Sequence, residues 1–215
     1  TLKELTFTVK EPVLEALDRN IVSETLVSLP DRDEIIEVNF TETYNFATFT
    51  LGISKKGNVR VYEKPKRDDY FKAKVDSNSD LLVFTDKGIA YRFKAAMVQN
   101  LVNQEISLEN LTTSFDSSKE KVLNIIAVDE LNESQCVYFF TKGGLIKRTL
   151  LKEYTSGAAE LQSYKFKSNE DKLVGVSFSA NDSAEVIIVT LKGMAIRFEA
   201  SSVSTTGRVT SGVMG

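Results

Sequence analysis

The fold is decided by the stretch Thr141-Lys-Gly-Gly-Leu-Ile-Lys-Arg148, because its pattern occurs four times in this chain of 215 residues. Each copy contains Ser or Thr, two mostly polar residues, Gly, two further residues and usually a basic one. The other copies span 54–60, 85–92 and 190–197. A pattern that recurs at intervals of tens of residues predicts similar units that stack or form a ring.

Each copy is flanked by sequence typical of β-strands. Short apolar runs interrupted by a polar stretch with Gly predict β-hairpins, in which Gly adopts the positive φ of a tight turn. The runs that lead into the turns are 49–53, 81–84, 137–140 and 186–189. The predicted turn glycines are Gly57, Gly88, Gly144 and Gly193. The sequence therefore predicts an all-β fold built on four hairpins.

Side chains alternate along the strand that leaves each turn, so the fourth and fifth residues after Gly face opposite ways. In the last three copies the fourth residue is basic and the fifth is mostly bulky, which predicts basic side chains outside and bulky ones inside. The basic residues are Arg92, Arg148 and Arg197, and the residues that follow them are Phe93, Thr149 and Phe198. In the first copy Arg60 is third and Val61 fourth, so its basic group is expected to point elsewhere.

Further apolar stretches precede three of the hairpins, at 34–38, 122–128 and 173–178, and predict units of at least three strands. The turn glycines are 31, 56 and 49 residues apart, so the second unit is expected to be trimmed, with 71–75 as its spare strand. We predict one domain over 1–215 with approximate blades at 31–75, 76–118, 119–168 and 169–215. Residues 1–30, with a strand at Leu5 to Val9 and a helical turn at 12–17, are expected to end a preceding blade or close the domain.

The composition excludes several classes of function. Histidine is absent and Cys136 is the single cysteine, so the commonest general base, the zinc ligands and an internal disulfide are all missing. Cys136 lies in an apolar strand and is expected in the core. No glycine-rich phosphate loop follows a strand, and no carboxylate has a companion nucleophile. We predict a noncatalytic chain that binds no metal or other cofactor.

No apolar run approaches the ~18 residues of a transmembrane helix, and the N-terminus lacks a signal segment. We therefore expect a cytoplasmic protein without a membrane partner.

Positive charge is concentrated on the hairpins, although the chain carries a net charge of −3. The windows 54–66, 85–94, 141–152 and 190–199 carry +4, +2, +4 and +1, which leaves −14 for the remaining residues. Hairpins that point the same way would form a basic rim able to follow a phosphate backbone through counterion release. For any single residue a solvated strand edge remains an equal alternative.

The candidate DNA contacts are Lys55, Lys56, Arg60, Lys64, Lys87, Arg92, Lys94, Lys142, Lys147, Arg148, Lys152, Lys192 and Arg197. The adjacent pairs Lys55 with Lys56 and Lys147 with Arg148 are expected to contribute most, because each concentrates charge near a hairpin tip.

These repeats resemble the C-terminal domain of the A subunit of bacterial type IIA topoisomerases, the enzymes DNA gyrase and topoisomerase IV. The resemblance rests on the strings at 83–88, 140–149 and 188–193 and on the closing Thr206-Gly-Arg-Val-Thr-Ser-Gly-Val213. It extends from about residue 30 to the end. It implies a β-pinwheel of propeller-like four-stranded blades, with DNA bent around its basic outer edge.

The resemblance also implies a place in a larger enzyme. The domain would position a double-stranded DNA segment for strand passage, while ATP and Mg²⁺ are bound and DNA is cleaved elsewhere. The implied partners are DNA, the remainder of the A subunit, and the B subunit. Gyrase normally carries a Gln-Arg-Arg-Gly-Gly-Lys-Gly box, which this chain lacks, so the chain looks more like topoisomerase IV, with gyrase second. Residues 207–215 resemble a connector into a following blade, which predicts a fragment of a longer domain.

A β-propeller scaffold that binds proteins and not DNA is the rival interpretation, with the repeated turns purely structural. The absence of tryptophan, and hence of the WD dipeptide, disfavours it. A catalytic propeller ranks third because no acid pair stands out. DNA binding at physiological salt distinguishes the first two interpretations.

Overall fold

The computed structural model describes residues 5–9, 36–40, 48–62, 71–102, 104–128, 135–155, 157–179 and 183–215. The chain divides into two units, Thr1–Asn45 and Phe46–Gly215. In the first unit β1 (Leu5–Val9) pairs antiparallel with β2 (Ile36–Phe40), which confirms the strand expected there. The helical turn expected at 12–17 lies outside the described residues.

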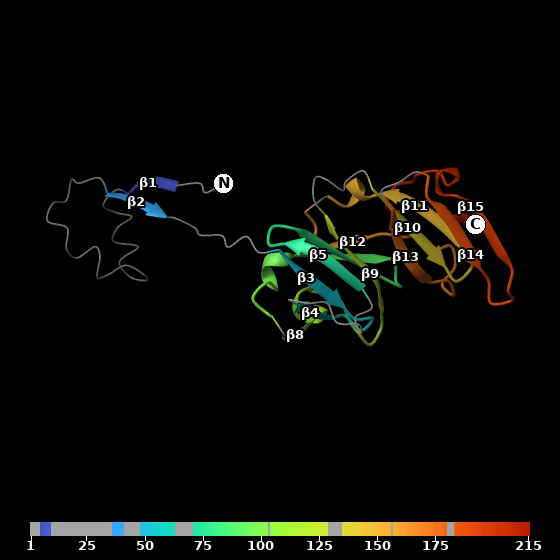
Figure 1. Cartoon of the computed structure of the whole chain (residues 1–215), viewed down its shortest axis with the longest axis horizontal. Coiled ribbons are helices and arrows are strands. Elements are labelled where there is room, and N and C mark those ends of the chain that lie inside the picture. Colours follow the sequence, from blue (N-terminus) through green and yellow to red (C-terminus); the bar gives the residue numbers. More distant parts are fainter. Residues whose placement is uncertain are drawn as a thin grey trace. The chain divides into compact units, whose positions relative to one another are not determined.

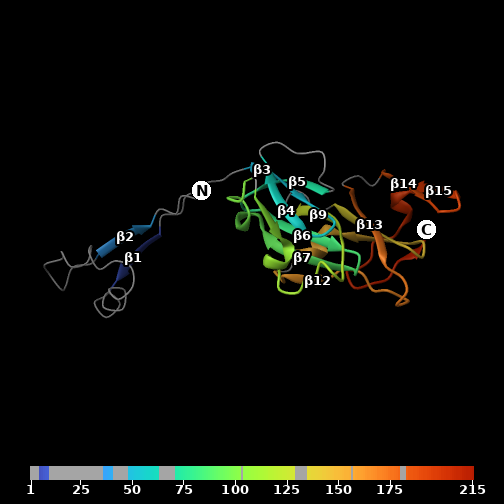
Figure 2. The same cartoon turned by 90° about the horizontal axis from the view of Figure 1, so that it is seen from below.

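In the second unit, each predicted hairpin forms the centre of an antiparallel sheet. The hairpins are β3 (Thr48–Ile53) with β4 (Asn58–Tyr62), β6 (Asp80–Thr85) with β7 (Ile89–Lys94), β10 (Cys136–Thr141) with β11 (Leu145–Leu150), and β14 (Glu185–Val189) with β15 (Ala195–Glu199). Figures 1 and 2 show these sheets following one another in chain order. The prediction of an all-β fold of repeated propeller-like blades is confirmed.

Outer strands of two to seven residues complete three of the sheets. They are β5 (Phe71–Asp76), β8 (Glu105–Ser107), β9 (Val122–Val128), β12 (Glu160–Gln162), β13 (Leu173–Ser179) and β16 (Val213–Met214). The sheet orders are β5-β3-β4-β8, β9-β6-β7-β12 and β13-β10-β11-β16, whereas β14 and β15 form a two-stranded sheet among the described residues. A single 3₁₀ turn follows each of the strands β7, β8, β11 and β15. These turns span Ala95–Met97, Leu108–Asn110, Leu151–Tyr154 and Ala200–Ser202.

The pairing of the outer strands differs from the expectation in a systematic way. The stretches 122–128 and 173–178 were expected to join the hairpin that follows them, but β9 pairs with β6 and β13 pairs with β10 of the preceding hairpin. The second outer strand of each sheet comes from beyond the next hairpin, as β8 and β12 do. The sheets therefore interleave along the chain and reach beyond contiguous ranges such as 76–118.

The second repeat, around Gly88, is also not trimmed. Its hairpin lies in a four-stranded sheet, because the strand at 71–75, which was assigned to it, pairs with β3 of the first hairpin as β5. The short interval between the first two glycines reflects the fact that only one strand, β5, separates these hairpins, whereas later intervals contain two.

The inner sheets are covered on both faces. Leu81 and Val83 of β6 lie in a core shared with the first sheet, whereas Leu82 and Phe84 lie in a second core shared with the third sheet. The third sheet in turn places Tyr138 in a third core with the last hairpin. Side chains of a strand point alternately to the two faces of its sheet. Because another sheet packs on each face, both sets of side chains are removed from water.

The repeated Ser or Thr and Gly have distinct roles in the turns. All four predicted turn glycines have positive φ, between 74° and 85°. The hydroxyl of Ser54 accepts the backbone N–H of Asn58 at 3.0 Å, and Thr141 and Thr190 accept the equivalent amides at 3.2 Å and 3.1 Å. This side-chain bond satisfies a turn amide and explains why a hydroxyl residue recurs at this position.

We predict that Gly88→Ala destabilises the protein more than Gly144→Ala. Both positions have positive φ, which costs an alanine about 1–2 kcal/mol. An added Cβ at Gly88 would lie 2.9 Å from Cβ of Tyr164, whereas at Gly144 nothing lies within 4 Å. Crowding adds about 1–3 kcal/mol at Gly88. Urea denaturation measures both losses, and equal losses would contradict the close packing at Gly88.

Candidate nucleic-acid interface

Lys147 is buried, although it was expected to be among the strongest DNA contacts. Its side chain is 2% exposed, and Nζ donates to the carbonyl oxygens of Ser163, at 2.6 Å, and Arg208. The ammonium group also lies 5.1 Å from the ring centre of Phe139 and 5.5 Å from that of Tyr164. Burial, and secondarily the charge of Arg208, lower the pKa of Lys147 to about 7. Lys147 therefore joins the third sheet to the segment around Arg208.

Arg148 is buried as well, so the expectation that it faces outward is wrong. It is 7% exposed, and its Nε donates to Sγ of Cys136 at 3.1 Å. The guanidinium lies over the ring of Tyr138, in the core between the third sheet and the last hairpin. The face of β11 that was predicted to meet solvent packs instead against the last hairpin. Cys136 is a buried free thiol, as predicted.

The other predicted DNA contacts that lie on described strands, Arg60, Arg92, Lys94 and Arg197, are paired with carboxylates. Ion pairs join Arg60 to Glu105 and Arg197 to Glu185. Asp80 lies 2.9 Å from Nζ of Lys94 and 3.7 Å from a guanidinium nitrogen of Arg92, whose side chain is only 9% exposed. Arg197 is exposed, as expected, because no described strand covers its face.

The lysines in the hairpin turns behave differently from those on the strands. Lys55, Lys56, Lys87, Lys142 and Lys192 are all exposed. In the part of the chain that the structure describes, no ion pair with another residue is formed by Lys56, Lys87, Lys142 or Lys192. Lys152 is also exposed, at the opposite end of its hairpin, and Lys64 lies outside the described residues.

Backbone hydrogen bonds join the first turn to the second through the start of β9. The carbonyl of Lys55 accepts the N–H of Val122 at 2.9 Å, and the carbonyl of Lys121 accepts the N–H of Asp86 at 2.9 Å. The carboxylate of Asp86 accepts the N–H of Lys121 at 2.8 Å. These hydrogen bonds place Lys121 between the two turns, and its side chain is exposed.

The same arrangement joins the second turn to the third. The N–H of Leu173 donates to the carbonyl of Asp86 at 3.2 Å, and the carbonyl of Lys172 accepts the N–H of Lys142 at 2.9 Å. Asp171 accepts the N–H of Gly143 at 2.9 Å. Exposed lysines from turns and connecting strands thus follow one another across three sheets. We call this set the lysine row: Lys55, Lys56, Lys121, Lys87, Lys172 and Lys142.

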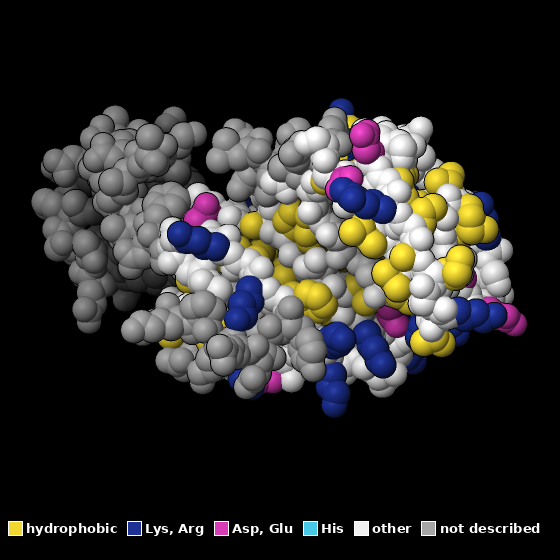
Figure 3. All heavy atoms as spheres, turned by 45° about the vertical axis from the view of Figure 1, so that its right-hand side comes forward, with side chains coloured by type: hydrophobic (Ala, Val, Ile, Leu, Met, Phe, Trp, Pro, Cys, Tyr) yellow, Lys and Arg dark blue, Asp and Glu magenta, His cyan; other side chains and the backbone are white. Residues whose placement is uncertain are grey.

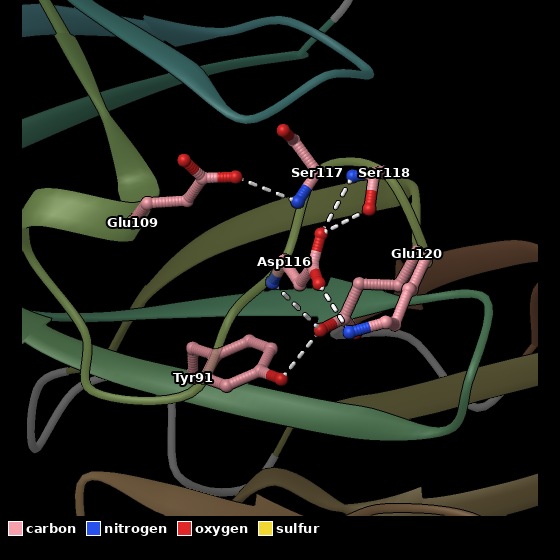
Figure 4. A network of polar contacts seen from close by, with 7 residues as sticks. Tyr91, Glu109, Asp116, Ser117, Ser118 and Glu120 are labelled. Atoms are coloured by element: carbon pink, nitrogen blue, oxygen red, sulfur yellow. Dashed lines mark hydrogen bonds and ion pairs between the residues drawn. The ribbon is translucent and has the colours of Figure 1, made fainter.

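A polar network fixes the segment that carries Lys121 (Figure 4). The hydroxyl of Tyr91 donates to the carboxylate of the buried Glu120 at 2.6 Å, and the N–H of Asp116 approaches the same oxygen at 3.5 Å. Burial first, and then the bond to Glu120, raise the pKa of Tyr91 above its ordinary value. Because Glu120 precedes Lys121, this network positions that end of β9.

Lys121 and Lys172 are not among the contacts predicted from the sequence, although a signal for them exists. They occur in Glu120-Lys-Val-Leu123 and Asp171-Lys-Leu-Val174, an acidic residue and a lysine directly before each of two apolar stretches. This second repeat is visible in the sequence, but its proximity to the turns depends on the pairing of β9 and β13 with preceding hairpins.

The described residues were also compared with the requirements of a metal site, an enzyme active site and a membrane-spanning helix. The described residues contain no group of three or more His, Cys, Asp or Glu side chains that could hold a metal ion. A hollow on the first sheet is lined by Thr48, Phe49, Thr50, Val61, Tyr62, Lys74 and Val102, which include no acid pair or nucleophile with a base. No helix among the described residues is long and apolar enough to span a membrane.

Comparison with known proteins identifies the class of this fold. The family described as DNA gyrase C-terminal domain, beta-propeller, matches residues 79–101, 137–179 and 184–215. The gyrase A protein of Halalkalibacterium halodurans is 32% identical over 151 residues, which are 69% of this chain and 18% of that protein. The chain thus spans about a fifth of the length of this relative.

Two solved structures share the fold. The C-terminal domain of a DNA topoisomerase IV superimposes with a TM-score of 0.67 at 20% identity, over 80% of this chain and 58% of that one. A DNA gyrase A C-terminal domain gives a TM-score of 0.55 at 20% identity, over 79% and 60%. The repeated interleaved blades define a β-pinwheel. The chain belongs to the family of C-terminal domains of bacterial type IIA topoisomerase A subunits.

We predict that the stability of the protein rises with pH because of Lys147. Its folded pKa of about 7 lies below the ordinary 10.5, so between about pH 7 and pH 9 the unfolded chain binds a proton that the folded chain has lost. The free energy of unfolding then increases by at most about 1.4 kcal/mol per pH unit. Urea denaturation across this range measures the slope.

Lys147→Met should abolish this slope, whereas Lys152→Met, which removes an exposed lysine of the following 3₁₀ turn, should leave it unchanged. An unaltered slope in Lys147→Met would show that another group titrates.

Proposed function

We propose that this chain binds and bends double-stranded DNA for a bacterial type IIA topoisomerase. The observation that carries the proposal is the lysine row, in which exposed cations from three sheets lie in sequence along one end of the blades. Such a row can neutralise consecutive phosphates without reading bases. The family membership and the shared fold support the same proposal.

The bound segment would be positioned for ATP-dependent strand passage, with the domain itself noncatalytic. ATP, Mg²⁺ and the DNA-cleaving tyrosine would belong to the B subunit or to the remainder of the A subunit, which are the proposed protein partners. The proposed setting is the bacterial cytoplasm, where the DNA substrate lies.

The rival function, a scaffold for protein partners, has one observation in its favour. Ile187, Val189, Leu191 and Met194 of the last hairpin are between 63% and 106% exposed, and hydrophobic side chains are prominent on the C-terminal side of the surface in Figure 3. Exposed apolar patches often mark contacts with other protein segments. The two functions are compatible in one chain but differ in their response to DNA.

DNA binding is tested by fluorescence anisotropy with a duplex of about 40 base pairs in a salt series. We expect affinity to fall linearly on a logarithmic scale with salt, by a slope of about 0.9 for each neutralised phosphate. Energy transfer between end labels should increase on binding, because bending brings the ends together. No binding at low salt would refute the proposal and favour the scaffold.

We further propose that the domain comes from topoisomerase IV, since the Gln-Arg-Arg-Gly-Gly-Lys-Gly box is absent from the sequence. A nicked plasmid sealed by ligase while the chain is bound tests this assignment. A domain that bends DNA without chiral wrapping should leave the linking number unchanged. A shift that grows with protein concentration would favour gyrase.

A further inference from the structure

The lysine row contains two members that occupy the spaces between turns. Lys121 lies between the first and second turns and Lys172 between the second and third. Each lysine accepts a backbone N–H from the later turn through its carbonyl, and the N–H of the residue after it donates to a carbonyl of the earlier turn. We infer that the DNA backbone follows the turn end of the sheets and that Lys121 and Lys172 bind phosphates between successive turns. This inference rests on the DNA binding proposed above.

The spacing of the charges along the lysine row supports this path. Packed sheets lie about 10 Å apart, so turns of neighbouring sheets alone would present charge at intervals of about 10 Å. A lysine between each pair of turns shortens the interval to about 5 Å. One strand of a DNA duplex carries a phosphate about every 3.4 Å along the helix axis. Lys121 and Lys172 therefore bring the spacing of the charges along the row closer to that of the phosphates.

The ammonium groups of the two intervening lysines are also available to bind phosphates. Lys121 and Lys172 are exposed and form no ion pair with another described residue. The carboxylates of Asp86 and Asp171, in the same turns and connecting segments, accept backbone N–H groups at 2.8–2.9 Å. These acids therefore act in building the turns, while the lysine ammonium groups remain directed to solvent.

The opposite end of the sheets provides a contrast. There Lys94 pairs with Asp80, and Lys152 stands beside Glu153. Strands of six residues separate the two ends by about 20 Å, well beyond the ~8 Å screening length at physiological salt. A duplex on the lysine row would therefore gain little from Lys94 or Lys152.

The matched experiment compares two double variants of the whole chain. Lys121→Ala with Lys172→Ala removes one lysine from each of the second and third sheets at the turn end. Lys94→Ala with Lys152→Ala removes the same charge at the opposite end of these two sheets. The salt slope of duplex binding is measured for both variants and for the wild type, after circular dichroism confirms folding.

We expect the first variant to lose about 1.8 from the slope, or 0.9 for each lost phosphate contact, and to bind unrelated sequences equally weakly. The second should retain the wild-type slope. Wild-type binding with an unchanged slope in the first variant, or equal losses in both variants, would overturn the inferred path and leave DNA binding intact. Failure of the wild type to bind would refute the proposed function and the inference together.

Discussion

Burial of the inner sheets on both faces is the constraint on which the rest of this structure depends. Leu81 and Leu82 are neighbours on one strand and point in opposite directions, yet both are fully buried because a further sheet packs on each side. In such a stack a strand offers few exposed positions. Solvent is reached chiefly at the strand ends, in the turns and on the outermost sheets.

This constraint explains why three arginines at the same position in the repeat differ in solvent exposure. Arg148 lies between two sheets and is buried, Arg92 is nearly so and contacts Asp80, and Arg197 is exposed on the last hairpin. Their positions relative to the turn glycine are identical. The number of neighbouring sheets, and not the alternation of the strand, determines whether each charge meets solvent.

Exchange of outer strands connects the blades and orders their turns. The carbonyls of Gly57, Gly88 and Gly144 accept amides from Leu108, Ser163 and Gly215, which lie after the next hairpin in the chain. The starts of β9 and β13 make complementary bonds on the other side of the turns. Each turn is therefore attached to chain segments from neighbouring repeats, and this attachment arranges separate lysines into one row.

The sequence by itself determined the four hairpins, their turn glycines and the all-β repeat, because hydrophobic alternation and positive φ are local properties of the chain. It also located the exposed turn lysines, such as Lys56 and Lys87. Only the tertiary structure decided the partners of β9 and β13, the burial of Lys147 and Arg148, and the places of Lys121 and Lys172 beside the turns. These features depend on contacts between residues far apart in sequence. A local hydrophobic pattern predicts that a strand forms but does not indicate which other strand it pairs with.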